Sequence, residues 1–240
     1  MSQIAFSAET GALIEAFSLT DETWETLRTA PLGALLMPRS QWPAIPKTSI
    51  KGLRFFAHYP GYTGVKPKPE SYAHTRLKID ILKAARTLGF DSQIEAAGRS
   101  PDGAEWIADV LVTLPTGQKT AFEVQLSSQH LADFRLRTER YRHSSVACCW
   151  VVSEHPVASR LAKALAYDNM DWYKKHGELL SESEELMVLG LLLEDKASYP
   201  AQPLLRLGYT QEARKLTIQE AVEGVLRGRP RWEQAQWKWY

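Results

Sequence analysis

The segment Val146–Val152 is apolar at every position, and it restricts the fold more strongly than any other part of the sequence. A half-buried strand alternates apolar and polar residues, whereas a strand buried on both faces is apolar throughout, as in the centre of an α/β sheet. Both cysteines of the chain, Cys148 and Cys149, lie in this strand. Because neighbours in a strand point to opposite faces, we expect no disulfide between them.

The preceding segments predict an α/β fold with the element order αβββαβ. Apolar residues with helical spacing indicate a first helix that opens at Pro69 and Glu70 and ends at Gly89: Ala73, Leu77, Ile81, Ala84 and Leu88. Strands are expected at 91–96, 106–114 and 119–126, and the last two form a hairpin. A second helix, capped by Ser127 or Ser128 and running to about Arg142, precedes the apolar strand.

We divide the chain into an N-terminal appendage (1–66), the core (67–155) and a mainly helical C-terminal extension (156–240). In the appendage, closely spaced prolines exclude a long helix beyond residue 31. Short strands are expected at 12–17 and 53–58, with a helix capped near Thr20 or Asp21. In the extension, the run Leu186–Leu193 fits either a strand or a buried helix, because periodicity cannot distinguish them in so short a segment.

Three tryptophans lie in the last nine residues of the chain: Trp232, Trp237 and Trp239. They indicate that the C-terminus docks on the protein itself rather than fraying. Binding of a protein partner through this Trp-rich tail is the alternative interpretation.

The charges exclude a strongly basic surface, since 29 Lys and Arg residues nearly cancel 28 Asp and Glu residues and leave a net charge of +1. An anionic partner must therefore bind to a local patch. The first 20 residues lack the basic start and apolar run of a signal peptide, and no window reaches the roughly 18 apolar residues of a membrane span. We expect a cytoplasmic protein that does not enter the membrane.

Two carboxylates interrupt neighbouring apolar strands. Asp109 lies within Ile107–Val112, and Glu123 lies within Ala121–Leu126, on the other arm of the predicted hairpin. A hairpin can bring the two side by side, where like charges repel and call for a cation. A hard divalent ion such as Mg²⁺ binds one or two carboxylates and suits phosphodiester hydrolysis. Each acid taken alone fits a structural role, but the pair favours a metal site.

Two further groups of polar residues have members one helical turn apart. Glu70, His74 and Lys78 form a polar stripe on the first helix, which can face a cleft. Arg137 and Tyr141 lie on one edge of the second helix, where a phosphate could be held. A solvated helix face is the alternative interpretation for the stripe, and for Arg137 and Tyr141 the two interpretations are about equally supported.

This order of elements, with Asp109 on the second strand and Glu123-Val124-Gln125 on the third, resembles the PD-(D/E)XK, or restriction-endonuclease-like, nuclease core. Within it, the segment Arg54–Trp150 resembles the competence protein CoiA-like family. The matching motifs are Phe55-Phe56-Ala57-His58, Glu70-x3-His74-x3-Lys78, Ala108-Asp109-Val110, Glu123-Val124-Gln125-x-Ser127 and Arg137-Thr138-x2-Tyr141.

The resemblance implies a metal-dependent nuclease that acts on DNA in uptake, recombination or defence. Asp109 and Glu123 carry over as ligands of Mg²⁺ or Mn²⁺, and Glu70 as an auxiliary ligand. The expected contacts to DNA phosphate come from His74, Ser127, Arg137 and Tyr141.

The sequence departs from the resemblance in two places. The usual lysine of the superfamily is Gln125, which carries no charge and cannot act as a base. Gln125 is then expected to position water or the metal's shell, and Lys78 to supply the missing charge. Relatives can carry paired cysteines before the Phe-Ala-His segment, but the residues from Leu36 to Trp42 include none, so we predict no structural zinc and a packing role for His58.

The leading hypothesis is therefore a Mg²⁺- or Mn²⁺-dependent deoxyribonuclease. The competing hypothesis is a catalytically inactive DNA-binding or scaffold protein on a nuclease-like core, which the substitution at Gln125 motivates.

Overall fold

A computed structural model describes residues 1–65, 69–177, 186–194, 198–207, 214–233 and 236–240. The chain forms two units, Met1–Tyr72 and Ala73–Tyr240. None of the described helices is both long enough and apolar enough to cross a lipid bilayer.

The first unit is built from short antiparallel strands and one helix. Its strands are β1 (Ile4–Ser7), β2 (Leu13–Glu15), β3 (Leu35–Leu36), β4 (Ala44–Thr48) and β5 (Arg54–His58). They form a three-stranded sheet in the order β2-β1-β3 and the separate pair β4-β5. The helix α1 (Asp21–Arg28) begins after Thr20, whose side chain accepts a hydrogen bond from the Thr23 amide, so the predicted cap is confirmed. Buried Trp24 and Phe56 contact each other in the core of this unit.

His58 has packing contacts at the end of β5. Its ring stacks on that of Tyr62, with 4.0 Å between the centroids, and its Nε2 lies 3.0 Å from Ser40 Oγ. These contacts fit the packing role that the sequence predicts for this histidine.

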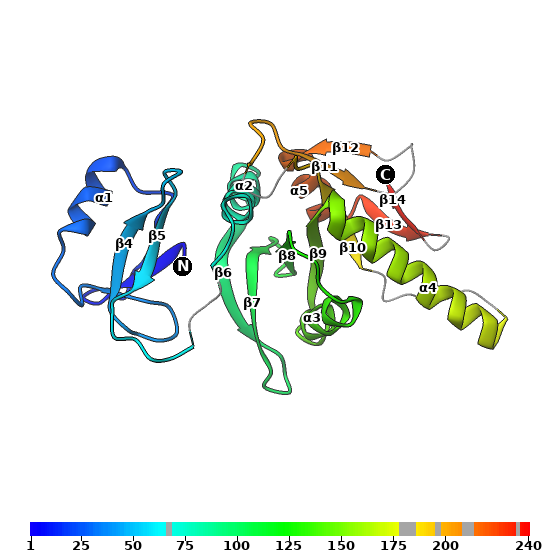
Figure 1. The fold of residues 1–240 in the computed structure, drawn as a ribbon, viewed down its shortest axis with the longest axis horizontal. Coiled ribbons are helices and arrows are strands. Elements are labelled where there is room, and N and C mark those ends of the chain that lie inside the picture. The colour runs from blue at the N-terminus through cyan, green and yellow to red at the C-terminus, as the bar shows by residue number, and fades with distance from the viewer. Residues whose placement is uncertain (66–68, 178–185, 195–197, 208–213, 234–235) are drawn as a thin grey trace. The chain divides into compact units, whose positions relative to one another are not determined.

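The second unit has the predicted core order αβββαβ (Figure 1). The elements are α2 (Tyr72–Thr87), β6 (Asp91–Arg99), β7 (Glu105–Thr113), β8 (Lys119–Gln125), α3 (Leu131–His143) and β9 (Val146–Ser153). Helix α2 buries Leu77, Ile81 and Ala85 completely, which are four residues apart and so lie on one face. Gly89 follows with φ of 83°, a left-handed conformation that ends the helix region.

A seven-stranded mixed sheet runs through this unit in the order β12-β11-β10-β9-β8-β7-β6. The three strands at its centre, β8, β9 and β10 (Met187–Leu191), are parallel, and the other neighbouring pairs are antiparallel. Trp150, Val151 and Val152 of β9 are completely buried, as expected for a central strand covered on both faces. Phe134 of α3 and Leu161 of α4 (Ser159–His176) pack with Trp150 on one of these faces.

The region after Pro156 is more mixed than the predicted helical extension. It holds the helices α4 and α5 (Ile218–Leu226), but it also extends the sheet by β10, β11 (Leu204–Leu207) and β12 (Arg214–Thr217). The apolar run Leu186–Leu193 is thus largely a strand: β10 pairs with β9 and buries Leu189 and Leu191 completely. A short run that is buried on both sides has no periodicity, so the sequence could not reveal its partner strand.

The two serines that the sequence offers as caps for α3 have other partners. The helix begins after His130, which makes no side-chain capping bond. Ser127 instead accepts hydrogen bonds from Gln125, and Ser128 Oγ accepts one from Arg160 at 2.5 Å. The predicted cap is therefore wrong, because both hydroxyls link the loop after β8 to its surroundings.

The C-terminal hairpin of β13 (Pro230–Glu233) and β14 (Gln236–Trp239) docks on the second unit. Trp237 Nε1 donates a hydrogen bond to the Leu186 carbonyl oxygen at 3.1 Å. The ring of Trp239 covers Gly224 of α5 so closely that a Cβ at position 224 would lie 2.1 Å from it. The predicted docking of the tail on the protein itself is confirmed.

Candidate functional site

Asp109 lies at an interruption of the β6–β7 ladder. The pairs Ile94–Val110 and Ala96–Ala108 flank the interruption, and Glu95 has φ of 53°, which is rare outside glycine. Asp109 Oδ2 accepts a hydrogen bond from the Val124 amide at 2.8 Å, so its side chain bridges β7 to β8. This bond fixes the carboxylate and leaves Oδ1 to face α2.

Helix α2 brings His74 and Lys78 to the same oxygen atom. His74 Nε2 lies 3.5 Å and Lys78 Nζ lies 3.8 Å from Asp109 Oδ1. The two residues are one turn apart on the helix, as the predicted stripe requires. The Lys78 side chain is completely buried, whereas those of His74 and Asp109 are slightly exposed. The stripe therefore faces the sheet and not open solvent.

Glu95 is a member of this cluster that the sequence analysis missed. Its Oε1 lies 3.3 Å from Lys78 Nζ, so the buried ammonium lies between the carboxylates of Glu95 and Asp109. The signal was a single acid within the predicted strand 91–96. That signal is weak, because an acid at the edge of a sheet is usually solvated and the unusual backbone conformation cannot be seen in the sequence.

Glu123 is completely buried and has partners on α3. Its carboxylate forms an ion pair with Arg137 and accepts a hydrogen bond from the Tyr141 hydroxyl. Residues Arg137 and Tyr141 thus share one edge of the helix, as predicted, but both contact this carboxylate. Arg137 keeps one third of its side chain exposed, whereas Tyr141 is buried.

Gln125 and Ser127 form a small polar group at the end of β8. Gln125 Nε2 donates hydrogen bonds to the Ser127 carbonyl oxygen at 2.7 Å and to Ser127 Oγ at 2.9 Å. Ser127 is exposed, so this group reaches the surface at the carboxyl end of β8. The amide of Gln125 is thereby oriented, although it brings no charge.

The environments of the two acids shift their pKa values in opposite directions. Burial raises the pKa of Asp109, but contacts with His74 and Lys78 outweigh burial and hold that pKa well below its ordinary value. Burial and the charge of Asp109 raise the pKa of Glu123, against the opposing effects of Arg137 and Tyr141. Burial and then Glu123 also raise the pKa of Tyr141, which stays a hydrogen-bond donor. Asp109 is the acid that is ionised over the wider pH range.

Three described residues form a group that can hold a divalent metal. Glu70, just ahead of α2, His74 and Asp109 each offer one ligand atom, and these atoms lie within 4.8 Å of one another. Carboxylate oxygens suit Mg²⁺ and Mn²⁺, whereas an imidazole nitrogen is a ligand for transition metals rather than for Mg²⁺. The group contains Asp109 and Glu70 of the predicted ligands and adds His74. Glu123 is the neighbour of this group and not one of its members.

A comparison with protein families agrees with this geometry. The profile described as competence protein CoiA, nuclease-like domain, matches residues 70–190. The match extends from just ahead of α2 to β10, covers half of the chain and contains every predicted site residue. No curated protein matches the chain. The αβββαβ core and the matched half of the sequence show that this chain belongs to the competence protein CoiA family, with that family's nuclease-like domain at its core.

Proposed function

We propose that this protein hydrolyses phosphodiester bonds of DNA with the help of a divalent metal ion held at Asp109. The observation that carries the proposal is the convergence on one Asp109 oxygen of His74 and of the buried Lys78 ammonium, beside Glu70. A metal ion in such a position polarises a phosphoryl oxygen and assists the attack of water. This activity would take place in the cytoplasm and serve DNA uptake, recombination or defence.

The residues of the chain take distinct roles in this proposal. Asp109, Glu70 and His74 bind the ion, and Glu123 supports Asp109 from the adjacent strand or joins the ligands when the ion is present. Lys78 places a positive charge near the reacting phosphate, which the neutral Gln125 cannot do. Gln125 orients water through its fixed amide.

The proposed direct contacts to DNA phosphate come from Ser127 and Arg137, and from His74 beside the metal. Ser127 is exposed at the end of β8, and the partly exposed guanidinium of Arg137 has more donors than its ion pair with Glu123 uses. Tyr141 is buried, so its contribution to the phosphate passes through Glu123.

The test is a cleavage assay on single-stranded, linear and circular DNA with Mg²⁺, Mn²⁺ or EDTA. We expect cutting that requires the metal and that falls by at least about 100-fold in Asp109→Asn. Glu123→Gln is expected to reduce cutting as well. The full rate in both variants would exclude the proposed site. The substrates that are cut would distinguish endonuclease from exonuclease action.

A second candidate function is a DNA-binding scaffold without catalytic activity. The observation that favours it is the engagement of Glu123 by Arg137 and Tyr141, which satisfies this carboxylate without a metal ion. Calorimetry separates the two functions. If Mn²⁺ binds to the wild-type protein and not to Asp109→Asn, the nuclease is favoured, whereas no uptake by either protein favours the scaffold.

A further inference from the structure

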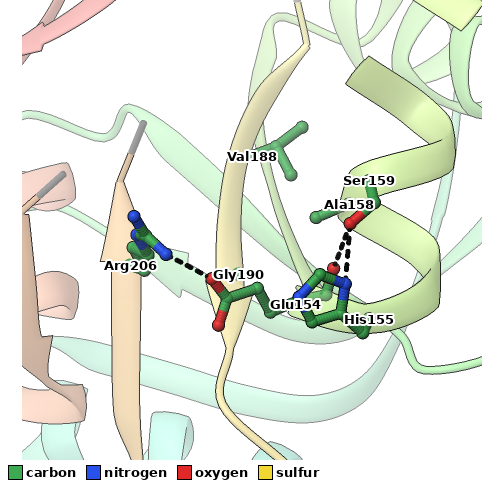
Figure 2. A pocket seen from close by; sticks show the side chains of 7 residues that line it. All are labelled: Glu154, His155, Ala158, Ser159, Val188, Gly190 and Arg206. Carbon is green, nitrogen blue, oxygen red and sulfur yellow. Dashed lines mark hydrogen bonds and ion pairs between the residues drawn. The ribbon is translucent and has the colours of Figure 1, made fainter. Parts of the chain in front are cut away.

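A small polar pocket lies at the carboxyl ends of the parallel strands β9 and β10, within the second unit (Figure 2). Its volume is about 170 Å³, which is room for one phosphate group with a few water molecules. The carboxyl ends of parallel strands are where α/β sheets commonly bind ligands. The pocket is lined by Glu154, His155, Ala158, Ser159, Val188, Gly190 and Arg206.

The polar side chains of the pocket are arranged by contacts among themselves (Figure 2). Arg206 Nη1 lies 2.5 Å from Glu154 Oε1, and the two side chains are mostly buried. His155 Nδ1 lies 2.8 Å from Ser159 Oγ, which also donates to the Glu154 carbonyl oxygen at 3.2 Å. A guanidinium, an imidazole and a hydroxyl are groups that bind phosphate oxygens in proteins.

A continuous row of paired residues joins this pocket to the proposed cutting site. Gln125 of β8 is paired with Val152 of β9, Val152 with Gly190 of β10, and Gly190 with Arg206 of β11. Paired residues in neighbouring strands lie on the same face of a sheet. With about 4.8 Å between neighbouring strands, Arg206 is roughly 14 Å from Gln125 along this row.

A hydrogen bond also connects the loop after β8 with the helix that borders the pocket. Arg160, in the first turn of α4, donates a hydrogen bond to Ser128 Oγ in the loop that follows β8. Arg160 is exposed and is the neighbour of the pocket residue Ser159, while Ser128 is the neighbour of Ser127. Polar and positively charged groups thus continue from Ser127 to Arg206 along one edge of the sheet.

We infer that the pocket formed by Arg206, Ser159 and His155 binds a phosphate group on the same DNA strand that the proposed nuclease site cuts, away from the cut itself. The inference rests on the proposed function for its ligand. The chemistry that the pocket recognises is a phosphate oxyanion, from the DNA backbone or from a free mononucleotide product.

Glu154 has an opposing role in this site. Its carboxylate orients the Arg206 guanidinium, and it also competes with the phosphate for that guanidinium. If the ion pair is purely structural, neutralising Arg206 and neutralising Glu154 break the same contact and have the same effect. If the pocket binds phosphate, the two have opposite effects on affinity. Loss of the Arg206 charge weakens binding, whereas loss of the Glu154 charge removes the competitor and strengthens it.

The test compares Arg206→Gln with Glu154→Gln in the full chain. Binding of a fluorescent oligonucleotide is measured by anisotropy in EDTA, at several salt concentrations. Arg206→Gln is expected to weaken binding about tenfold and to lower the slope of log K against log salt by about 0.7 for single-stranded DNA. Glu154→Gln is expected to tighten binding by about threefold. Arg99→Gln, which breaks the exposed ion pair with Glu105 at the far edge strand, serves as the matched control and should change little.

The same proteins are titrated with inorganic phosphate and with a deoxynucleoside monophosphate. Binding of these small ligands that depends on Arg206 identifies a product site, and binding of the oligonucleotide alone identifies a backbone site.

If Arg206→Gln does not fold, Ser159→Ala, which leaves the ion pair intact, replaces it and should weaken binding. Equal affinities for all variants overturn the inference, even where the wild-type protein cuts DNA. Arg206-dependent binding without any cutting supports the inference and contradicts the nuclease.

Discussion

The ammonium group of Lys78 is buried between the carboxylates of Glu95 and Asp109. A buried charge requires such partners, because an unpaired ammonium away from water would lose its proton or destabilise the fold. The chain has Gln125 where the superfamily that it resembles usually has a lysine. Lys78 lies beside Asp109, a member of the group that can hold a metal, and in the proposed function it supplies the charge that Gln125 lacks.

Replacement of Lys78 by Met tests this role. We expect the DNA cleavage rate of Lys78→Met to fall by about 10²- to 10³-fold, because one charge that stabilises the transition state is lost. Affinity for DNA should change little. Lys83→Met is the control on the same helix, since Lys83 is exposed. An unchanged rate in a folded Lys78→Met protein would exclude Lys78 from the chemistry.

The ion pair of Glu123 and Arg137 predicts a pH dependence of stability. Burial and Asp109 raise the pKa of Glu123, so the folded protein binds more protons at this site than the unfolded chain does. The contribution of Glu123 to stability therefore falls as the pH rises from the ordinary pKa of glutamate through the raised one. Arg137 offsets this loss, because it stabilises the ionised form.

Arg137→Gln should consequently destabilise the protein by about 2 kcal/mol at alkaline pH, and by less at pH 5, where Glu123 is protonated. Urea denaturation at the two pH values measures the difference from wild type. Arg142→Gln, which removes one of the partners of the more exposed Glu139, should change the free energy of unfolding little at both pH values. An equal loss at both pH values in Arg137→Gln would contradict the account of Glu123.

At the scale of helices and strands, the pattern of apolar residues was sufficient to predict the order of elements in the αβββαβ core. The helical spacing of Leu77 and Ile81 predicted α2, and the continuous apolar run predicted the central strand β9. Both patterns arise because these side chains are buried in the fold. The predicted cap of α3 was wrong, because the hydroxyls of Ser127 and Ser128 accept hydrogen bonds from Gln125 and Arg160. Competition between such partners depends on the folded arrangement and not on the local sequence.

Contact between α5 and β14 gives a prediction at the same scale. An alanine at position 224 would improve helix propensity, but its Cβ would lie 2.1 Å from the Trp239 ring. We expect Gly224→Ala to lower the free energy of unfolding by about 1–3 kcal/mol through overpacking. The control is the same substitution in a Trp239→Ala protein, where it should be neutral or stabilising. A loss of equal size in both backgrounds would show that the tail does not pack on α5.

For the whole molecule, the sequence was most informative within residues 70–190, the part that the family profile matches. Helical spacing placed His74 and Lys78 on one face of the first helix, whereas their position beside Asp109 was implied by the family resemblance and not by spacing. Glu95 could not be placed in advance, since its contact depends on an interruption of the ladder. The strands β11 and β12 also escaped prediction, because long-range pairing leaves little local signal.

The near-zero net charge of the molecule also has a consequence. With 29 basic and 28 acidic residues, the DNA binding that we propose requires local groups, such as those at the ends of the strands from Ser127 to Arg206. Sequence alone could not identify this row of groups, which is assembled from four strands and the start of α4.

The measurement that tests the central claim most directly is the cutting of supercoiled circular DNA in Mn²⁺ by the wild-type protein and by Asp109→Asn. Asp133→Asn, which changes an exposed acid on α3, is the matched control. We predict that the wild-type and control proteins cut the DNA, that EDTA stops the cutting, and that Asp109→Asn does not cut. Cutting by Asp109→Asn at the wild-type rate, or cutting that EDTA leaves unchanged, would contradict a metal-dependent site at Asp109.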